Sequence, residues 1–151
     1  MSIAIVSAGG GEIVSAGPMR IRILEDGGHT QHRLGVVEVT IPPHADGPPQ
    51  HIHHEHEETF YVVSGTPKFT CCTDTITAEL GTLVTAPIGT PHTFGNPGDV
   101  PAIMLCTLTP DLYIDYFREL DALSTGTTGL DPRSVADVMA RYATEVAKPT
   151  Q

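Results

Sequence analysis

Glycine and proline recur along the whole chain and divide it into short segments. There are 15 glycines and 13 prolines in 151 residues, and no single tract holds them. Such an even spread is typical of many short strands joined by turns. The pattern therefore favours an all-β fold for most of the chain.

Between these breaks, segments of alternating polar and apolar residues recur about every ten residues. In the segment 34–41, Val37, Val39 and Ile41 fall on one face of a strand and Glu38 and Thr40 on the other. Strands are predicted at 19–24, 34–41, 51–53, 59–64, 68–72, 75–79, 82–86, 92–94 and 101–107. This spacing indicates an antiparallel sandwich or barrel.

After Pro110 the pattern becomes helical. Apolar residues recur at helical spacing, at Leu112, Tyr116, Leu120 and Leu123. A second helix is predicted to start at Asp131 and Pro132, an N-cap followed by proline at the first helical position. The segment 124–130 would join the two as a helical hairpin. We expect one domain over residues 1–151, with an N-terminal arm (1–18), a β-barrel (19–110) and C-terminal helices (111–147).

Charge and cysteine content exclude several classes of protein. The formal net charge of −10 argues against nucleic acid or an anionic membrane as a partner. No window approaches 18 consecutive apolar residues, and the N-terminus lacks a basic region, so neither a membrane span nor a signal peptide is predicted. Three cysteines, Cys71, Cys72 and Cys106, form no disulfide framework and are expected to be reduced core residues of a cytoplasmic protein.

Five of the eight histidines lie within residues 44–56. Taken singly, His44, His54 and His56 are expected in a solvated loop or on the surface; the alternative for His54 and His56 is that they line the entrance to the site. His51 and His53 are different, because residues two apart in a strand project from the same face and their imidazoles can converge on one cation.

Glu58 begins an apolar segment and shares its predicted strand face with Phe60 and Val62. A carboxylate at such a position needs a partner.

Two motifs resemble the signatures of the cupin superfamily. The first, GPPQHIHHEHEETFYVVSG, holds Gly47, His51, His53, Glu58 and Gly65; the second, GTLVTAPIGTPHTFGN, matches every fixed position from Gly81 to Asn96 and includes His92. In the first, only three residues separate Gly47 from His51, where the family has five. Over about residues 35–145 the chain is similar to small cupins of the quercetin dioxygenase type.

The resemblance implies an all-β jelly-roll barrel, with a short C-terminal helical hairpin in this chain, and a homodimer. It also implies one divalent transition metal per subunit, held by His51, His53, Glu58 and His92. Three imidazoles and a carboxylate suit Fe, Mn, Ni, Co or Zn, and the sequence does not choose among them.

The expected function is that of a metal-dependent dioxygenase. Its substrate would be a small organic molecule that chelates the metal, such as an enol, a catechol or a flavonol-like compound. Glu58 would be a ligand and a catalytic base, or a structural ligand only. The alternatives are a non-redox isomerase or polyketide-type cyclase that uses the metal as a Lewis acid, and a non-catalytic binding protein.

Other side chains have two interpretations each. Phe60, Phe94 and Met104 would line an apolar substrate pocket or pack in the core. Tyr113, Tyr116 and Phe117 would close one end of the barrel or pack on the dimer mate. Arg20 and Arg22 are expected in solvent rather than at an anionic substrate, and Asn96 is expected to fix a turn.

Overall fold

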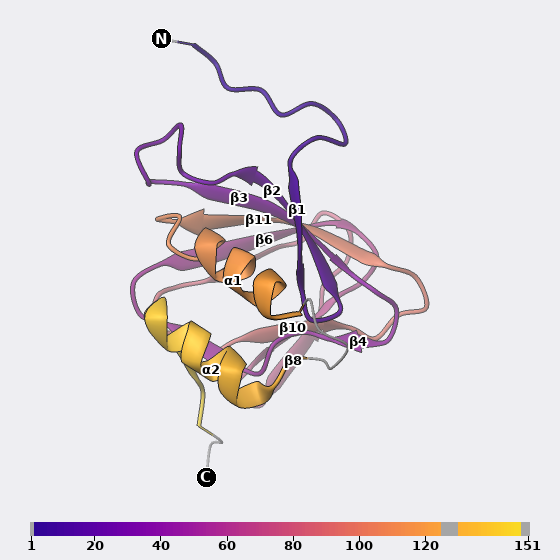
Figure 1. The fold of residues 1–151 in the computed structure, drawn as a ribbon. Coiled ribbons are helices and arrows are strands. Elements are labelled where there is room, and N and C mark those ends of the chain that lie inside the picture. Colours follow the sequence, from indigo (N-terminus) through magenta and orange to yellow (C-terminus); the bar gives the residue numbers. More distant parts are fainter. Residues whose placement is uncertain (1, 125–129, 149–151) are drawn as a thin grey trace.

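The computed structural model describes residues 2–124 and 130–148 of the chain. These ranges form twelve strands and two helices, and all the strand pairs in them are antiparallel. The two larger sheets form the layers of a jelly roll (Figure 1). The predicted fold class is confirmed.

The largest sheet has six strands. Their order is β1 (Glu12–Ala16), β2 (Met19–Glu25), β3 (Gly35–Ile41), β11 (Ala102–Thr109), β6 (Glu57–Ser64) and β9 (Leu83–Ala86). The second sheet has the order β4 (Ala45–Asp46), β10 (Thr93–Asn96), β7 (Lys68–Cys71) and β8 (Asp74–Thr77). A separate pair joins β5 (His51–His53) to β12 (Thr144–Val146).

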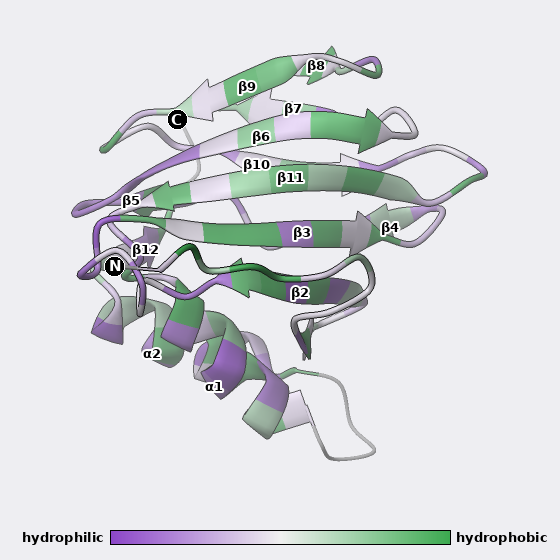
Figure 2. Cartoon of the chain, turned by 90° about the horizontal axis from the view of Figure 1, so that it is seen from above, coloured by the Kyte–Doolittle hydropathy of each residue, from purple (hydrophilic) through white to green (hydrophobic). Residues whose placement is uncertain are grey.

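The core lies on the inner face of the six-stranded sheet. Every second residue of β11 is buried, and Val37, Val39 and Ile41 of β3 are buried as the alternation predicts. Much of β3 and β11 is hydrophobic in Figure 2. Full burial of such a side chain contributes about 1.5–3 kcal/mol relative to exposure. This face therefore holds the jelly roll together.

Two helices follow the last long strand. Helix α1 (Ile114–Ser124) lies beside β1, and α2 (Pro132–Arg141) leads back to β12 (Figure 1). The carboxylate of Asp131 accepts a hydrogen bond from the backbone N–H of Ser134 at 3.1 Å, so α2 starts at the predicted N-cap. Residues 125–129 of the predicted linker lie outside the described residues. Among the described residues, no helix is long and apolar enough to cross a membrane.

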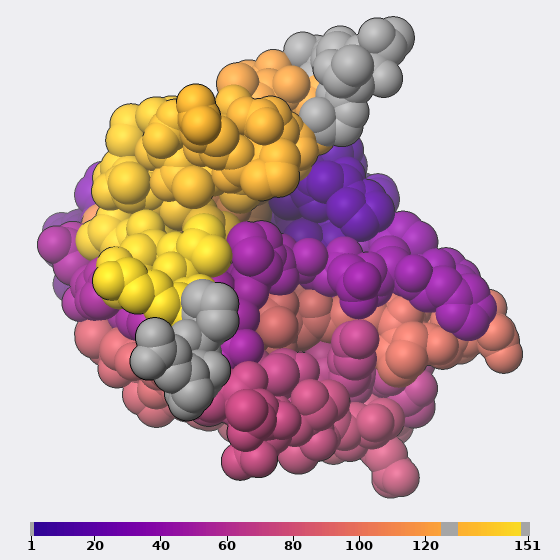
Figure 3. Space-filling model, turned by 90° about the horizontal axis from the view of Figure 1, so that it is seen from below, coloured from indigo at the N-terminus to yellow at the C-terminus, as the bar shows by residue number. Residues whose placement is uncertain are grey.

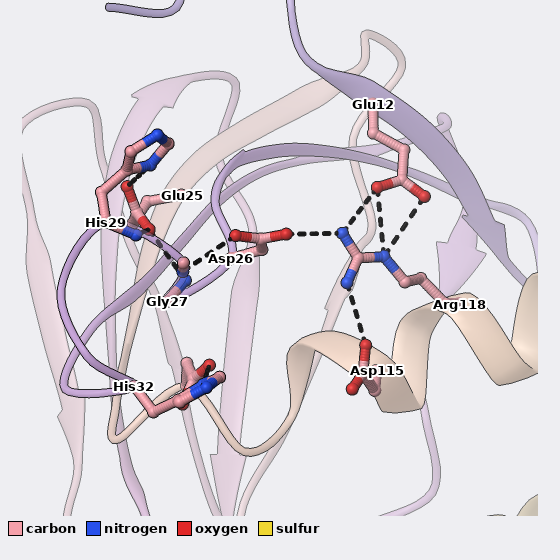
Figure 4. Close-up of polar contacts among 10 residues, drawn as sticks. Glu12, Glu25, Asp26, Gly27, His29, His32, Asp115 and Arg118 are labelled. Carbon is pink, nitrogen blue, oxygen red and sulfur yellow. Dashed lines mark hydrogen bonds and ion pairs between the residues drawn. The ribbon is translucent and has the colours of Figure 1, made fainter. Parts of the chain in front are cut away.

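An arginine fastens α1 to the sheet. Arg118 lies 2.7 Å from Glu12 in β1, 2.9 Å from Asp26 after β2 and 2.9 Å from Asp115 in its own helix (Figure 4). Ion pairs as exposed as these contribute about 1 kcal/mol or less each, but together they fix the place of the helix on β1.

The turn after β2 needs a glycine. Gly27 has φ +90°, and a Cβ built on it would lie 2.0 Å from Oδ2 of Asp111. That same oxygen lies 2.8 Å from Nδ1 of His32, a residue of the same turn. Any side chain at position 27 would displace the Asp111 carboxylate from this turn.

Two short strands lie where other structure was predicted. Within the predicted arm 1–18, residues 12–16 form β1, because Val14 and Ala16 bury against the core while β1 pairs with β2. Within the predicted helical segment 111–147, residues 144–146 form β12, which is held by pairing with β5.

The cysteine prediction is wrong for two of the three residues. Cys71 and Cys72 are exposed, because they lie at the turn between β7 and β8, where Cys71 pairs with Asp74. Cys106 is buried in β11, as expected.

Candidate metal centre

The two histidines of β5 face the interior together. His51 and His53 are buried and the intervening Ile52 is less so, as the two-residue alternation requires. One edge of β5 pairs with β12, and on the other side His51 forms a backbone bridge with His92. The sheet therefore brings the third imidazole, 39 residues later in the sequence, next to the first two.

The carboxylate comes from the adjacent layer. Glu58 lies in β6 on the same buried face as Phe60 and Val62. Its Oε2 lies 3.3 Å from Nε2 of His53 and 3.2 Å from Nε2 of His92. The structure thus brings together the four residues predicted as ligands: His51, His53, Glu58 and His92, all buried, with one ligand atom each within 4.8 Å of the others.

The second ring nitrogen of each imidazole is held in place. Nδ1 of His51 donates to the carbonyl of Pro49 at 2.8 Å, and Nδ1 of His92 donates to the carbonyl of Thr90 at 2.9 Å. Nδ1 of His53 lies 2.7 Å from the hydroxyl of Thr144 in β12. With the proton on Nδ1, each Nε2 carries a free lone pair toward the centre, as in metal-binding histidines.

These residues fit a bound transition metal. Nε2 of His53 is buried, faces Glu58 and has no hydrogen-bond partner among the described residues. Its lone pair is therefore available to a metal ion in the cluster. Nitrogen and carboxylate donors in this number suit Fe, Mn, Co, Ni or Zn. The donor set can therefore bind one divalent ion.

Burial and mutual charge set the ionisation of the cluster. Burial, with the neighbouring imidazoles, lowers the pKa of His51 to about 3. Burial alone would raise the pKa of the Glu58 carboxyl, but the surrounding histidines lower it well below its ordinary value. Against the effect of burial, the Glu58 carboxylate raises the pKa of His92. A neutral His51 beside an ionised Glu58 is the state that a cation requires.

The neighbouring histidines differ from one another. His54 is half-exposed near Glu145, as expected. The surface prediction for His56 is wrong: its side chain is fully buried, with Nε2 3.5 Å from Oε1 of Glu58. The chain bends between β5 and β6, and this bend turns His56 inward. The His-rich segment gave no sign of this, because strand alternation from His53 does not extend through the bend.

A cavity of about 180 Å³ adjoins the cluster. His51 and Glu58 lie in its wall, and so do Phe60 and Phe94, two of the predicted pocket residues. Met104 is fully buried in the core of β11, where it pairs with Val39, and the described lining does not include it.

The C-terminal helices close one side of this cavity. Tyr113, Tyr116 and Phe117 line it, which agrees with the prediction that they close one end of the barrel. The segment 47–49, the turn between β1 and β2, and inward side chains of β2, β3 and β11 also line the cavity. Figure 3 shows the face where these segments meet, with the helices in orange and yellow beside the β1–β2 turn in indigo and the purple segment near residue 50.

Other predicted residues lie away from the cluster. Arg20 is exposed, and Arg22 pairs with Glu38 at 3.0 Å on the outer face of the sheet. Asn96 fixes the turn region as expected, because its side-chain amide donates to the carbonyls of Ile41 and Val100 at 3.1 and 2.8 Å.

Comparison with known proteins identifies the family. The cupin domain family matches residues 37–108, the segment that contains all four cluster residues. No curated protein matches the sequence.

Three solved structures have a similar fold. An RmlC-like cupin from Shewanella frigidimarina has a TM-score of 0.60 at 21% identity, over 72% of this chain and 92% of that one. A predicted oxalate decarboxylase from Thermotoga maritima has a TM-score of 0.59 at 16% identity, over 66% and 90%. A sugar phosphate isomerase of the cupin superfamily from Silicibacter pomeroyi has a TM-score of 0.56 at 26% identity, over 61% and only 59%. The jelly roll, its histidine–glutamate cluster and the family match identify residues 37–108 as a cupin domain.

Proposed function

We propose that this cupin is a metal-dependent dioxygenase for a small organic substrate with neighbouring oxygen donors, such as an enol, a catechol or a flavonol-like molecule. The observation that carries the proposal is the position of the cluster: two of its four members, His51 and Glu58, lie in the wall of an otherwise largely apolar cavity. A substrate in that cavity would lie against the cluster.

His51, His53, Glu58 and His92 would hold one divalent transition metal. When bound, such an ion supplies redox chemistry toward dioxygen or polarises an oxygen of the substrate. The side chains of the site then bind and orient the substrate. Phe60 and Phe94 lie 5.3 Å apart between ring centres, with an interplanar angle of 54°, and would give the substrate an apolar, water-excluding surface.

The cavity favours a substrate without strong charge. Among the described residues that line it, none carries a cationic side chain, and the carboxylate of Glu58 adds negative charge. A buried phosphate needs a paired cation to offset its desolvation. The name of the Silicibacter protein refers to a sugar phosphate. In this cavity the proposed metal would be the one cation available to such a group, because no lysine or arginine is among the described lining residues.

Glu58 would also accept the proton of the substrate's hydroxyl. Its low pKa keeps the carboxylate ionised, and it lines the cavity beside His51. The variant Glu58→Gln can still offer an oxygen donor but cannot accept a proton near neutral pH. We expect turnover per bound metal to fall by about 10²–10⁴-fold. Turnover near that of the wild type would make Glu58 a structural ligand only.

Metal analysis followed by oxygen uptake tests the proposal. Purified protein is analysed for metals and then mixed with catechols and flavonols in an oxygen electrode. We expect one metal per chain and substrate-dependent oxygen consumption, both lost in the His51→Ala/His92→Ala double variant and retained in the surface variant His54→Gln. Product formation without oxygen uptake would instead support a Lewis-acid isomerase or cyclase. Binding without turnover would support a non-catalytic protein.

A further inference from the structure

His56 is a buried polar side chain that the ligand set does not use. Its exposed fraction is 0%, and neither ring nitrogen has a hydrogen-bond partner among the described residues. Leaving a buried polar group unpaired costs about 1–3 kcal/mol. A ring in this position is therefore expected to gain a partner in the working state of the protein.

Oε1 of Glu58 lies close to the His56 ring. The two carboxylate oxygens face different neighbours, because Oε2 lies 3.2 Å from Nε2 of His92 and 3.3 Å from Nε2 of His53, whereas Oε1 lies 3.5 Å from Nε2 of His56. At 3.5 Å this contact is too long for a good hydrogen bond. A small rotation of either side chain would close it.

The ring of His56 is fixed by its neighbours. Its centre lies 4.0 Å from that of His53, with an interplanar angle of 34°, and 5.0 Å from that of Tyr113, with an angle of 35°. Tyr113 in turn stacks on Tyr116 at 3.9 Å. The ring thus packs against two rings that themselves lie 4.6 Å apart between centres, and its Nε2 lies 3.5 Å from Oε1 of Glu58.

We propose that His56 is a positioning residue for the metal site: its Nε2–H donates to Oε1 of Glu58 and leaves Oε2 as the single oxygen presented to the metal. This inference rests on the proposed metal site. It accounts for the buried ring of His56 beside the cluster. It also accounts for the different neighbours of the two Glu58 oxygens, with Oε1 near His56 and Oε2 near His53 and His92. Without His56, the carboxylate would be free to rotate and to offer either oxygen.

Two variants distinguish the effect of the N–H donor from the effect of ring packing. His56→Phe keeps an aromatic ring packed against His53 and Tyr113 but removes the N–H donor. His56→Gln loses the ring but places an amide N–H near the position of Nε2. His54→Gln, in the same segment but exposed, is the matched control. Thermal melting of each metal-free variant checks that it folds, and His56→Leu replaces the phenylalanine variant if that one does not fold.

The readouts are the dissociation constant for Zn²⁺, from competition with a chelator, and the visible spectrum of the Co²⁺-loaded protein. Loss of a residue that orients a metal ligand lowers metal affinity about 10–100-fold. We expect that loss and a changed Co²⁺ spectrum for His56→Phe, and affinity within about threefold of the wild type for His56→Gln and His54→Gln.

Equal losses in the phenylalanine and glutamine variants would overturn the proposal, because ring packing would then be what matters. Wild-type affinity in the phenylalanine variant would overturn it as well. Failure of the wild-type protein itself to bind metal would instead remove the proposed function, and this inference with it.

Discussion

The hydrogen bond between His53 and Thr144 links the C-terminal strand to the metal centre. The Thr144 hydroxyl donates to the carbonyl of Tyr142 at 3.0 Å and can accept from Nδ1 of His53 at 2.7 Å. Both side chains are buried. Thr144→Val keeps the shape of the side chain and removes this acceptor.

The expected cost follows from burial. An unpaired buried donor costs about 1–3 kcal/mol, so the metal-free variant should unfold at a lower urea concentration. For a chain of this size each kcal/mol corresponds to a melting temperature about 2–4 °C lower. Because Nδ1 of His53 would no longer be held, affinity for Zn²⁺ should also fall about 10–100-fold.

Urea unfolding in the presence of a chelator measures the first effect, and chelator competition measures the second. Thr144→Ser keeps the hydroxyl and serves as the control, with stability and affinity expected close to those of the wild type. A valine variant with an unchanged urea midpoint and an unchanged dissociation constant would refute the assignment of Thr144 as the partner of His53.

Three further predictions concern pH, backbone strain and assembly. Because burial lowers the pKa of His51 to about 3, the unfolded chain binds a proton at this residue that the folded chain does not bind between that pH and about 6.5. The metal-free protein should therefore lose stability as pH falls through this window, on the order of 5 kcal/mol at most, with part of the loss offset by His92, whose pKa is raised. Urea unfolding at a series of pH values measures the change, and stability that rises as pH falls from 6.5 toward 3 would contradict it. Gly27→Ala forces φ +90° and a contact with Asp111, so the free energy of unfolding should fall by about 1–3 kcal/mol, whereas Gly17→Ala, at positive φ in open space, should cost less. Residues 2–6 expose apolar side chains, with Ile3 88% and Ile5 82% exposed. Because a second copy of the chain could cover these side chains, we expect a homodimer. A mass near that of one chain, 16.1 kDa, by light scattering would exclude it.

Much of the fold follows from local patterns. The alternation in residues 34–41 predicts that Val37, Val39 and Ile41 share one face, and the structure buries all three. The start of α2 follows from Asp131 and Pro132, because an N-cap depends on the residues at the helix end alone. Strand β12 was missed because three residues carry no usable periodicity, and only its pairing with β5 makes it a strand.

The metal cluster was predictable for a different reason. His51 and His53 lie two apart in one strand, so local geometry alone places them together. Glu58 and His92 were assigned from the spacing of two motifs. The partners that hold the site, His56 and Thr144, could not be predicted, because His56 lies in a bend and Thr144 arrives from 91 residues away.

Metal stoichiometry tests the central claim most directly. Wild-type protein and the His51→Ala/His92→Ala double variant are incubated with Zn²⁺ or Mn²⁺, desalted and analysed for bound metal per chain, after circular dichroism has shown that both are folded. We predict one ion per chain in the wild type and none in the double variant. Full occupancy in the folded double variant, or none in the wild type, would contradict a metal centre built from His51, His53, Glu58 and His92.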